Sequence, residues 1–99
     1  FIGDFFMEEF VTYILYSANY RKIYIGYSSS IIQRFYSHNT FSTKGYTLRY
    51  RPWVVLEVAF HDTKQCAMAR ERFLKSGKGR AYIYEVVIPK YRDIGFISA

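Results

Sequence analysis

The 99-residue chain is 51% apolar, contains eleven Tyr and nine Phe, and carries a formal net charge of +6. Its length predicts one domain with one compact core, and its charge favours a polyanionic partner, nucleic acid before any other. No apolar run approaches the roughly 18 residues of a membrane span, and residues 1–6 lack the basic start of a signal peptide. The single cysteine, Cys66, excludes an internal disulfide and a Cys/His metal cluster. We expect Cys66 to be a small core residue and the protein to be cytoplasmic.

The positive charge is concentrated in the middle of the chain. Between Arg21 and Arg80 there are twelve Lys or Arg against three acids, a net of +9, while the two ends are neutral to acidic. Such a surface favours contact with the phosphates of nucleic acid, and an ordinary solvated basic surface is the alternative. Residues 1–9 form an apolar and acidic lead-in without clear periodicity.

The first part of the chain predicts a β-hairpin. Val11–Ser17 is rich in β-branched and aromatic residues, which is typical of a strand, and Ala18–Lys22 has the composition of a turn. Ile23–Tyr27 predicts the second strand. Its alternation places Tyr24 and Gly26 on one face and the remaining three residues on the other. Because Gly26 has no side chain, another group can approach its backbone closely.

The next segment predicts a short helix. Ser28–Ser30 offers N-caps for a helix over Ile31–His38. Arg34 and His38 are four residues apart on this helix and therefore share a face, at the edge of its apolar arc. With Tyr24 on the preceding strand, this corner carries a phenol, a guanidinium and an imidazole, the groups that phosphate-ester hydrolysis would use.

Thr40–Pro52 indicates a long polar loop, and long loops in small domains are often functional. Basic residues alternate with aromatic ones along it, a pattern that suits contact with a nucleic-acid backbone and stacking on bases. An ordinary exposed loop is the alternative. Its candidate DNA-binding residues are Lys44, Arg49 and Arg51.

The second half of the chain predicts a strand followed by helices. Trp53–Phe60 is almost continuously apolar, which indicates a buried strand. Asp62 or Thr63 suits the N-cap of a helix that ends near Lys75. Gly77 suits the C-cap of that helix.

On this helix Glu71 lies at the edge of the expected apolar arc. Arg70 falls inside the arc, so we expect an ion pair or a phosphate contact for it. The expected arc consists of Cys66, Ala67, Ala69, Phe73 and Leu74. A further helix is predicted over Ala81–Val87, closed by Pro89, and Lys90–Ala99 indicates an irregular tail.

At this point the sequence resembles the GIY-YIG nuclease family. Val11-Thr12-Tyr13 stands at the first motif, and Tyr24-Ile25-Gly26 stands at the second. Arg34 follows Tyr24 by ten residues, as in the family pattern, and His38 follows four residues later. The combination is more specific than any one of its parts.

The C-terminal part of the chain resembles the same family. Ala69-Arg70-Glu71 and the run Leu74–Arg80 are similar to this region in small single-domain bacterial members, which are related to the N-terminal domain of the excision-repair endonuclease. The resemblance covers about residues 11–83. It implies one α/β (α+β) domain with its core over about residues 11–87, in which a small three-stranded antiparallel sheet is flanked by about three helices.

The sequence also departs from the family pattern. Val11 and Thr12 stand where the first motif has its Gly and Ile. Tyr27 follows Gly26 where some members have a lysine that helps to activate water. The asparagine that some branches use beyond the glutamate has no clear counterpart.

The resemblance implies a metal-dependent DNA endonuclease that hydrolyses a phosphodiester with one Mg²⁺ or Mn²⁺ ion, in a bacterial cytoplasm, for example in DNA repair or recombination. Tyr13 and Tyr24 match the motif tyrosines, and Arg34 matches the catalytic arginine. His38 matches a histidine of some branches, and Glu71 matches the single acidic metal ligand. The backbone of branched or duplex DNA would contact a wider basic set: Lys44, Arg49, Arg51, Arg70, Lys75, Lys78 and Arg80.

Several alternatives stay open. Tyr13, Tyr24 and His38 are all candidates for the general base. The tyrosines also have an ordinary interpretation as core aromatics, and Glu71 has one as the i,i+4 partner of Lys75. The second functional hypothesis is a non-catalytic nucleic-acid-binding module with the same fold, which would bind in a salt-sensitive way without cutting. The oligomeric state also stays open.

Overall fold

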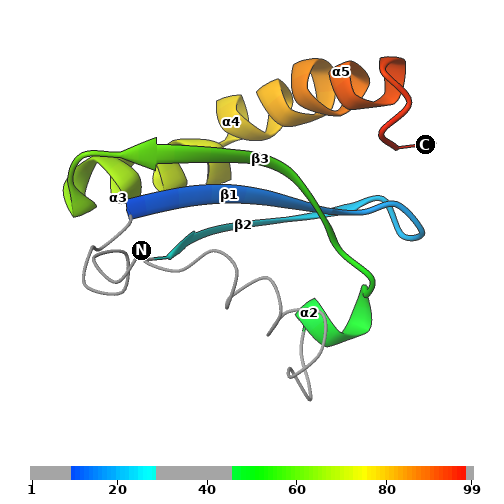
Figure 1. Cartoon of the computed structure of the whole chain (residues 1–99), viewed down its shortest axis with the longest axis horizontal. Coiled ribbons are helices and arrows are strands. Elements are labelled where there is room, and N and C mark those ends of the chain that lie inside the picture. Colours follow the sequence, from blue (N-terminus) through cyan, green and yellow to red (C-terminus); the bar gives the residue numbers. More distant parts are fainter. Residues whose placement is uncertain (1–9, 29–45, 98–99) are drawn as a thin grey trace, which may run out of the picture.

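The structure is a computed structural model that describes residues 10–28 and 46–97 of the chain. Three strands, β1 (Phe10–Ser17), β2 (Lys22–Ser28) and β3 (Val54–His61), form one antiparallel sheet in the order β2-β1-β3 (Figure 1). Each strand lies within one residue of its predicted bounds. The α+β fold with a three-stranded antiparallel sheet is therefore confirmed.

β1 is the central strand, and its side chains are buried on both faces of the sheet. Side chains alternate along a strand, so Ile14 and Tyr16 pack on one face. Tyr13 and Leu15 pack on the other face, against Trp53. β1 thus belongs to two separate hydrophobic clusters, and the sheet is the partition between them.

A layer of consecutive helices covers one face of the sheet. It consists of α3 (Lys64–Lys75), α4 (Gly77–Tyr82), the π-helix Ile83–Val87 and α5 (Ile88–Asp93). Figure 1 shows α4 and α5 above the sheet and the short helix α2 (Tyr46–Arg49) below it. The helical side chains in the core on this face are Leu74, Ile83, Val87 and Ile88. Within the described ranges, no helix has the length and hydropathy of a membrane span.

The chain stays helical through Pro89 to Asp93, the end of α5. The prediction that Pro89 closes the preceding helix is therefore wrong, and so is the first part of the irregular tail predicted over Lys90–Ala99. The N–H of Ile88 donates to the carbonyl of Ile83, which widens the helix directly before the proline. In a regular α-helix the proline ring collides with the carbonyl four residues back, and a π-turn relieves that crowding. Beyond α5 the chain turns back onto the core, so that Ile97 is only 6% exposed.

α3 begins and ends as predicted, with Thr63 as its N-cap and Lys75 as its last residue, but only part of the predicted arc is buried. Ala67 and Leu74, two members of the arc, are its buried residues. The prediction of Cys66 as a core residue is wrong, because Ala67 and Leu74 lie about 80–100° round the helix from it. Three members of the predicted apolar arc are exposed: Cys66, Ala69 and Phe73.

The other predictions for the fold have mixed outcomes. β3 is an edge strand and not a buried one, with Val58 37% exposed and Phe60 67% exposed. α2 lies within Thr40–Pro52, which is predicted as a loop, so that part of the prediction is wrong. Lys44 and the helix predicted over Ile31–His38 lie outside the described residues.

Replacing Ile97 by Ala tests whether the turn after α5 is part of the core. We expect the free energy of unfolding to fall by about 2–5 kcal/mol, because a buried aliphatic side chain is lost. Ile94→Ala is the matched control, since Ile94 is 70% exposed, and we expect it to change stability by less than about 0.5 kcal/mol. Urea unfolding followed by circular dichroism measures both, and equal effects of the two variants would contradict the assignment.

Candidate functional site

The ring of Tyr13 lies across the backbone of Gly26. The two residues are paired partners in the β1–β2 register, and a Cβ atom added at Gly26 would overlap the phenol of Tyr13. Tyr13 itself is only 1% exposed. The glycine of the second motif is therefore required by the tyrosine of the first, since any larger residue at this position displaces the ring.

Tyr24 continues this aromatic surface toward solvent. Its ring stacks on that of Tyr13, with the ring centroids 6.4 Å apart and an angle of 22° between the planes. On its other side it meets Trp53 edge to face, with a centroid distance of 6.2 Å. Because Tyr24 is half-buried whereas Tyr13 is buried, Tyr24 is the motif tyrosine that a substrate can reach.

Tyr24 lines a pocket of about 250 Å³ at the outer edge of the sheet. Ile23 and Ile25 of β2 contribute apolar wall, and Lys75 and Arg80 contribute two positive charges. Among the described residues that line it there is no acidic side chain. Two cations in the lining of an open pocket attract an anion such as a phosphate.

Ser76 places the two cations of the pocket on neighbouring helices. Its hydroxyl donates to the carbonyl of Phe73 at 2.5 Å, which caps the C-terminus of α3. The same oxygen accepts from the N–H of Gly79 at 3.1 Å, which caps the N-terminus of α4. The chain therefore bends sharply at Ser76, and Lys75 at the end of α3 comes close to Arg80 in α4.

Gly79 is the glycine that this bend requires. It is buried, and a Cβ atom on it would overlap the carbonyl oxygen of Phe73 and the backbone of Leu74. Gly77, by contrast, is the first residue of α4 and has open space around it. The prediction of Gly77 as the C-cap is wrong, because the Ser76 side chain makes the cap.

Glu71 reaches the same region from the helical side of the sheet. Its Oε2 accepts from Nζ of Lys75 at 3.2 Å, so the i,i+4 pair considered as an alternative is formed. α3 packs on the face that carries Ile23 and Ile25, whereas the ring of Tyr13 lies on the opposite face. Glu71 and Tyr13 are therefore separated by the sheet, and Lys75 joins Glu71 to the pocket at its edge.

The chemistry around Glu71 limits which metal ion fits. In residues 10–28 and 46–97 no three His, Cys, Asp or Glu side chains lie close enough to hold an ion together. The Glu71 side chain is 24% exposed, so water reaches part of it. A single carboxylate fits Mg²⁺ or Mn²⁺, since Mg²⁺ keeps several of its waters in protein sites.

The other candidate residues do not all belong to this pocket. Arg34, His38 and Lys44 lie outside the described residues. Arg70 is half-buried, and its guanidinium lies over the rings of Phe73 and Tyr82, at 5.2 and 5.7 Å from their centroids. It lies about 140° around α3 from Lys75, so it faces a different side of the helix from the pocket.

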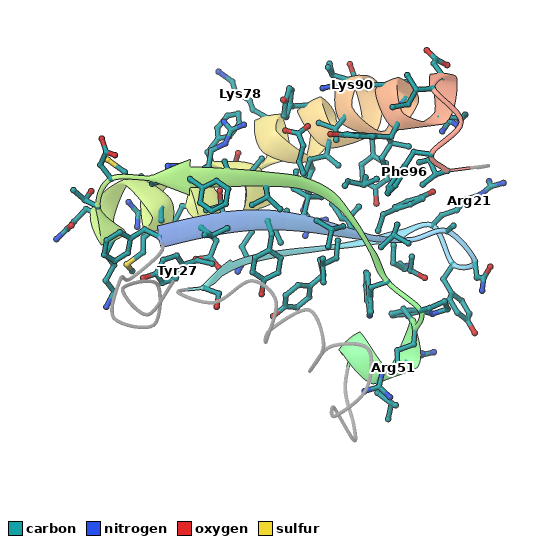
Figure 2. The ribbon with its side chains drawn as sticks, viewed as in Figure 1. Arg21, Tyr27, Arg51, Lys78, Lys90 and Phe96 are labelled. Carbon is teal, nitrogen blue, oxygen red and sulfur yellow. The ribbon has the colours of Figure 1, made fainter. Side chains whose placement is uncertain are left out.

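The remaining basic candidates divide between two places. Lys78 is exposed on α4 and stands away from the sheet in Figure 2. Arg49 is exposed on α2, and Arg51, just after it, is half-buried. Arg51 lies below the sheet, on the side opposite the helical layer (Figure 2), and the Arg49 guanidinium lies 5.5 Å from the centroid of the Tyr50 ring.

Thr12 makes a contact that the sequence analysis missed. Its hydroxyl shares a hydrogen bond of 3.0 Å with Nε2 of His61, the last residue of β3. Thr12 is only 2% exposed, so this bond satisfies a polar group in the core. The threonine that departs from the family's first motif thus has a partner of its own, which only the strand register could reveal.

Comparison with known proteins agrees with this geometry. The family model described as the GIY-YIG catalytic domain matches residues 9–83. The match spans all three strands, α3 and α4, and includes every residue that lines the pocket. No curated protein and no solved structure matches the chain.

Gly26→Ala tests the contact between the two motifs. We expect it to lower the free energy of unfolding by about 1–3 kcal/mol, because the new methyl group overpacks the site against the ring of Tyr13. Gly77→Ala is the matched control, and no loss is expected because nothing surrounds Gly77 and alanine favours helix.

The same urea titration on Gly26→Ala in a Tyr13→Leu background separates this contact from backbone effects. Much of the loss caused by the alanine should disappear once the ring is gone. An equal loss in both backgrounds would show that the ring is not the cause.

Proposed function

Because the chain belongs to the GIY-YIG catalytic domain family, we propose that it is a metal-dependent endonuclease that hydrolyses a phosphodiester bond of DNA. The observation that carries this proposal is the pocket at the edge of β2. Tyr24, Lys75 and Arg80 line this pocket together, and Glu71 is hydrogen-bonded to Lys75.

Hydrolysis of a phosphodiester needs a positioned water, neutralised phosphate charge and a protonated leaving group. Lys75 and Arg80 supply the positive charge for the phosphate. Tyr24 also lines the pocket, and in this proposal its phenol orients the attacking water. Arg34 would add a bidentate contact to the non-bridging oxygens.

Glu71 would hold the Mg²⁺ or Mn²⁺ ion, which when bound supplies a Lewis acid and an activated water. In the structure Lys75 neutralises this carboxylate. In the proposed reaction Lys75 transfers its hydrogen bond to the DNA phosphate, which leaves the carboxylate available to the ion.

The burial of the side chains narrows the choice of general base. Tyr13 is 1% exposed and its ring is covered, so it acts by holding Tyr24 and the strand pair in place. Tyr24 is half-buried and borders the pocket. The base is therefore Tyr24 or His38 in this proposal.

We propose further that the substrate is branched or duplex DNA, held through its backbone, and that the protein acts in DNA repair or recombination in a bacterial cytoplasm. The small size of the domain supports binding through the DNA backbone, because a small domain offers little surface for reading base edges. The net charge of +6 supports contact with the backbone.

The Lys75–Glu71 pair favours a second candidate function. If Glu71 keeps Lys75 as its partner at 3.2 Å and takes up no ion, the domain is a non-catalytic nucleic-acid-binding module. Such a module would bind DNA in a salt-sensitive way and would leave it intact in Mg²⁺ or Mn²⁺.

A nicking assay with Mg²⁺ or Mn²⁺ against EDTA, on branched and duplex DNA, decides between the two functions. We expect metal-dependent cutting that falls about a hundredfold or more in Glu71→Gln, because the ion loses its protein ligand, with DNA binding retained. Glu85→Gln removes an exposed carboxylate from the π-helix and should cut like the wild type. Undiminished cutting by Glu71→Gln would refute the metal assignment, and binding without cutting would support the module.

The pocket itself is tested by Lys75→Gln and Arg80→Gln. We expect each variant to bind duplex DNA more weakly and to reduce the slope of log K against log salt by about 0.9, the value of one phosphate contact. Arg92→Gln removes the same charge from α5, where the side chain is exposed. An equal change in slope for Arg92→Gln would mean that the pocket cations contribute only to the overall charge.

A further inference from the structure

A second group of aromatic and basic side chains lies at the turn between β1 and β2. Tyr50, which follows α2, is at its centre. Nζ of Lys22 lies 5.4 Å from the centroid of its ring, and the guanidinium of Arg49 lies 5.5 Å from it. The ring of Tyr20 meets it edge to face at 5.3 Å. We call Tyr20, Lys22, Arg49 and Tyr50 the hairpin-tip cluster.

The cluster presents one open aromatic ring. Tyr50 is half-buried against the hydrophobic cluster of Trp53, so it anchors the group. Tyr20 is 51% exposed, and its place in the turn is set by its N–H, which donates to the carbonyl of Ser17 at 3.3 Å. A fixed, exposed ring beside two cations is the usual form of a platform on which a nucleic-acid base stacks.

The chain segments that form this platform carry only positive charge. From Phe10 to Leu56 the sequence contains no Asp or Glu, so Lys22 and Arg49 have no carboxylate from this stretch near them. Figure 2 shows Arg21 at the hairpin tip and Arg51 below it, beside α2. Cations gathered at one ring repel each other, and a polyanion removes that repulsion.

Aromatic contacts connect the cluster to the pocket. Tyr50 packs on the hydrophobic cluster that contains Trp53 and Tyr13. Trp53 contacts Tyr24, and Tyr24 stacks on Tyr13. All of these rings lie on the face of the sheet opposite the helical layer. The hairpin-tip cluster is therefore joined to Tyr24 through a continuous set of packed rings.

We propose that the hairpin-tip cluster binds an unpaired nucleotide, with its base stacked on Tyr20 and its neighbouring phosphates held by Lys22 and Arg49. The substrate class is then DNA that has a single-stranded segment next to the cut site, an inference that rests on the proposed function. Fully paired DNA does not offer this contact, because its bases already stack on each other and their faces are closed to a protein ring.

The test is binding of a single-stranded oligodeoxythymidine of about twelve nucleotides, a length within the range of known single-strand sites, with one central 2-aminopurine. The protein is kept in EDTA so that no cutting occurs. Fluorescence anisotropy gives the Kd, and quenching of the 2-aminopurine reports stacking. We expect Tyr20→Leu to weaken binding about fivefold or more and to abolish the quenching. Tyr20→Phe should retain both.

Matched controls separate stacking and charge from general effects. Tyr84→Leu removes a tyrosine that is 45% exposed on the π-helix and should bind like the wild type. Lys22→Gln and Arg49→Gln should each reduce the salt slope by about 0.7, the value for a phosphate of single-stranded DNA. Lys90→Gln should not change the slope, although Lys90 also lies over a ring, that of Tyr91 at 5.2 Å.

Wild-type binding and quenching by Tyr20→Leu would overturn the proposal, as would equal losses in Tyr20→Leu and Tyr84→Leu. A cutting assay in Mg²⁺ on gapped and continuous duplexes keeps the two proposals apart. A protein that quenches through Tyr20 but never cuts refutes the nuclease and supports the platform. A protein that cuts both duplexes equally, with or without Tyr20, supports the nuclease and refutes the platform.

Discussion

The contact between the Tyr13 ring and the Gly26 backbone is the constraint from which the geometry of the site follows. It joins the central strand to the edge strand at one register, and a slip of one residue would turn every side chain of β2 to the other face. With this register, Tyr24 shares the face of Tyr13 and stacks on it. Ile23 and Ile25 face the helices instead. One face of β2 therefore presents Tyr24, and the other presents the two isoleucines that line the pocket.

How far the fold could be predicted depends on how local its causes are. The strands follow from alternation and composition, and Thr63 caps α3 as its hydroxyl suggests. The buried face of α3 cannot be predicted in this way. Its apolar Phe73 is exposed, while the charged Arg70 is half-buried beside the Phe73 ring, which is the reverse of what a count of apolar residues predicts. The exposure of β3 depends on the strand order β2-β1-β3, and strand order is a tertiary property.

The site was predictable to a similar extent. Motif spacing predicts Tyr13, Tyr24 and Glu71 as site residues, but it does not predict that the sheet separates Glu71 from Tyr13. The pairing of Lys75 with Arg80 arises from one serine hydroxyl that caps two helices, and no spacing rule encodes that bend. Only part of the hairpin-tip cluster could be predicted. The basic and aromatic pattern around α2 indicates Arg49 and Tyr50. The contacts of Tyr20 and Lys22 with Tyr50 join residues far apart in the chain and could not be predicted.

The position of β1 between its two neighbours also has a consequence for the order of folding. β2 is joined to β1 by a turn of a few residues, and such hairpins close in about 1–10 μs. β3 is separated from β2 by residues 29–53, and bringing the ends of this longer chain segment together costs more entropy. We therefore expect the hairpin to form early, with Tyr13 already lying over Gly26. We expect the contact between the two motifs to belong to the folding nucleus of the domain.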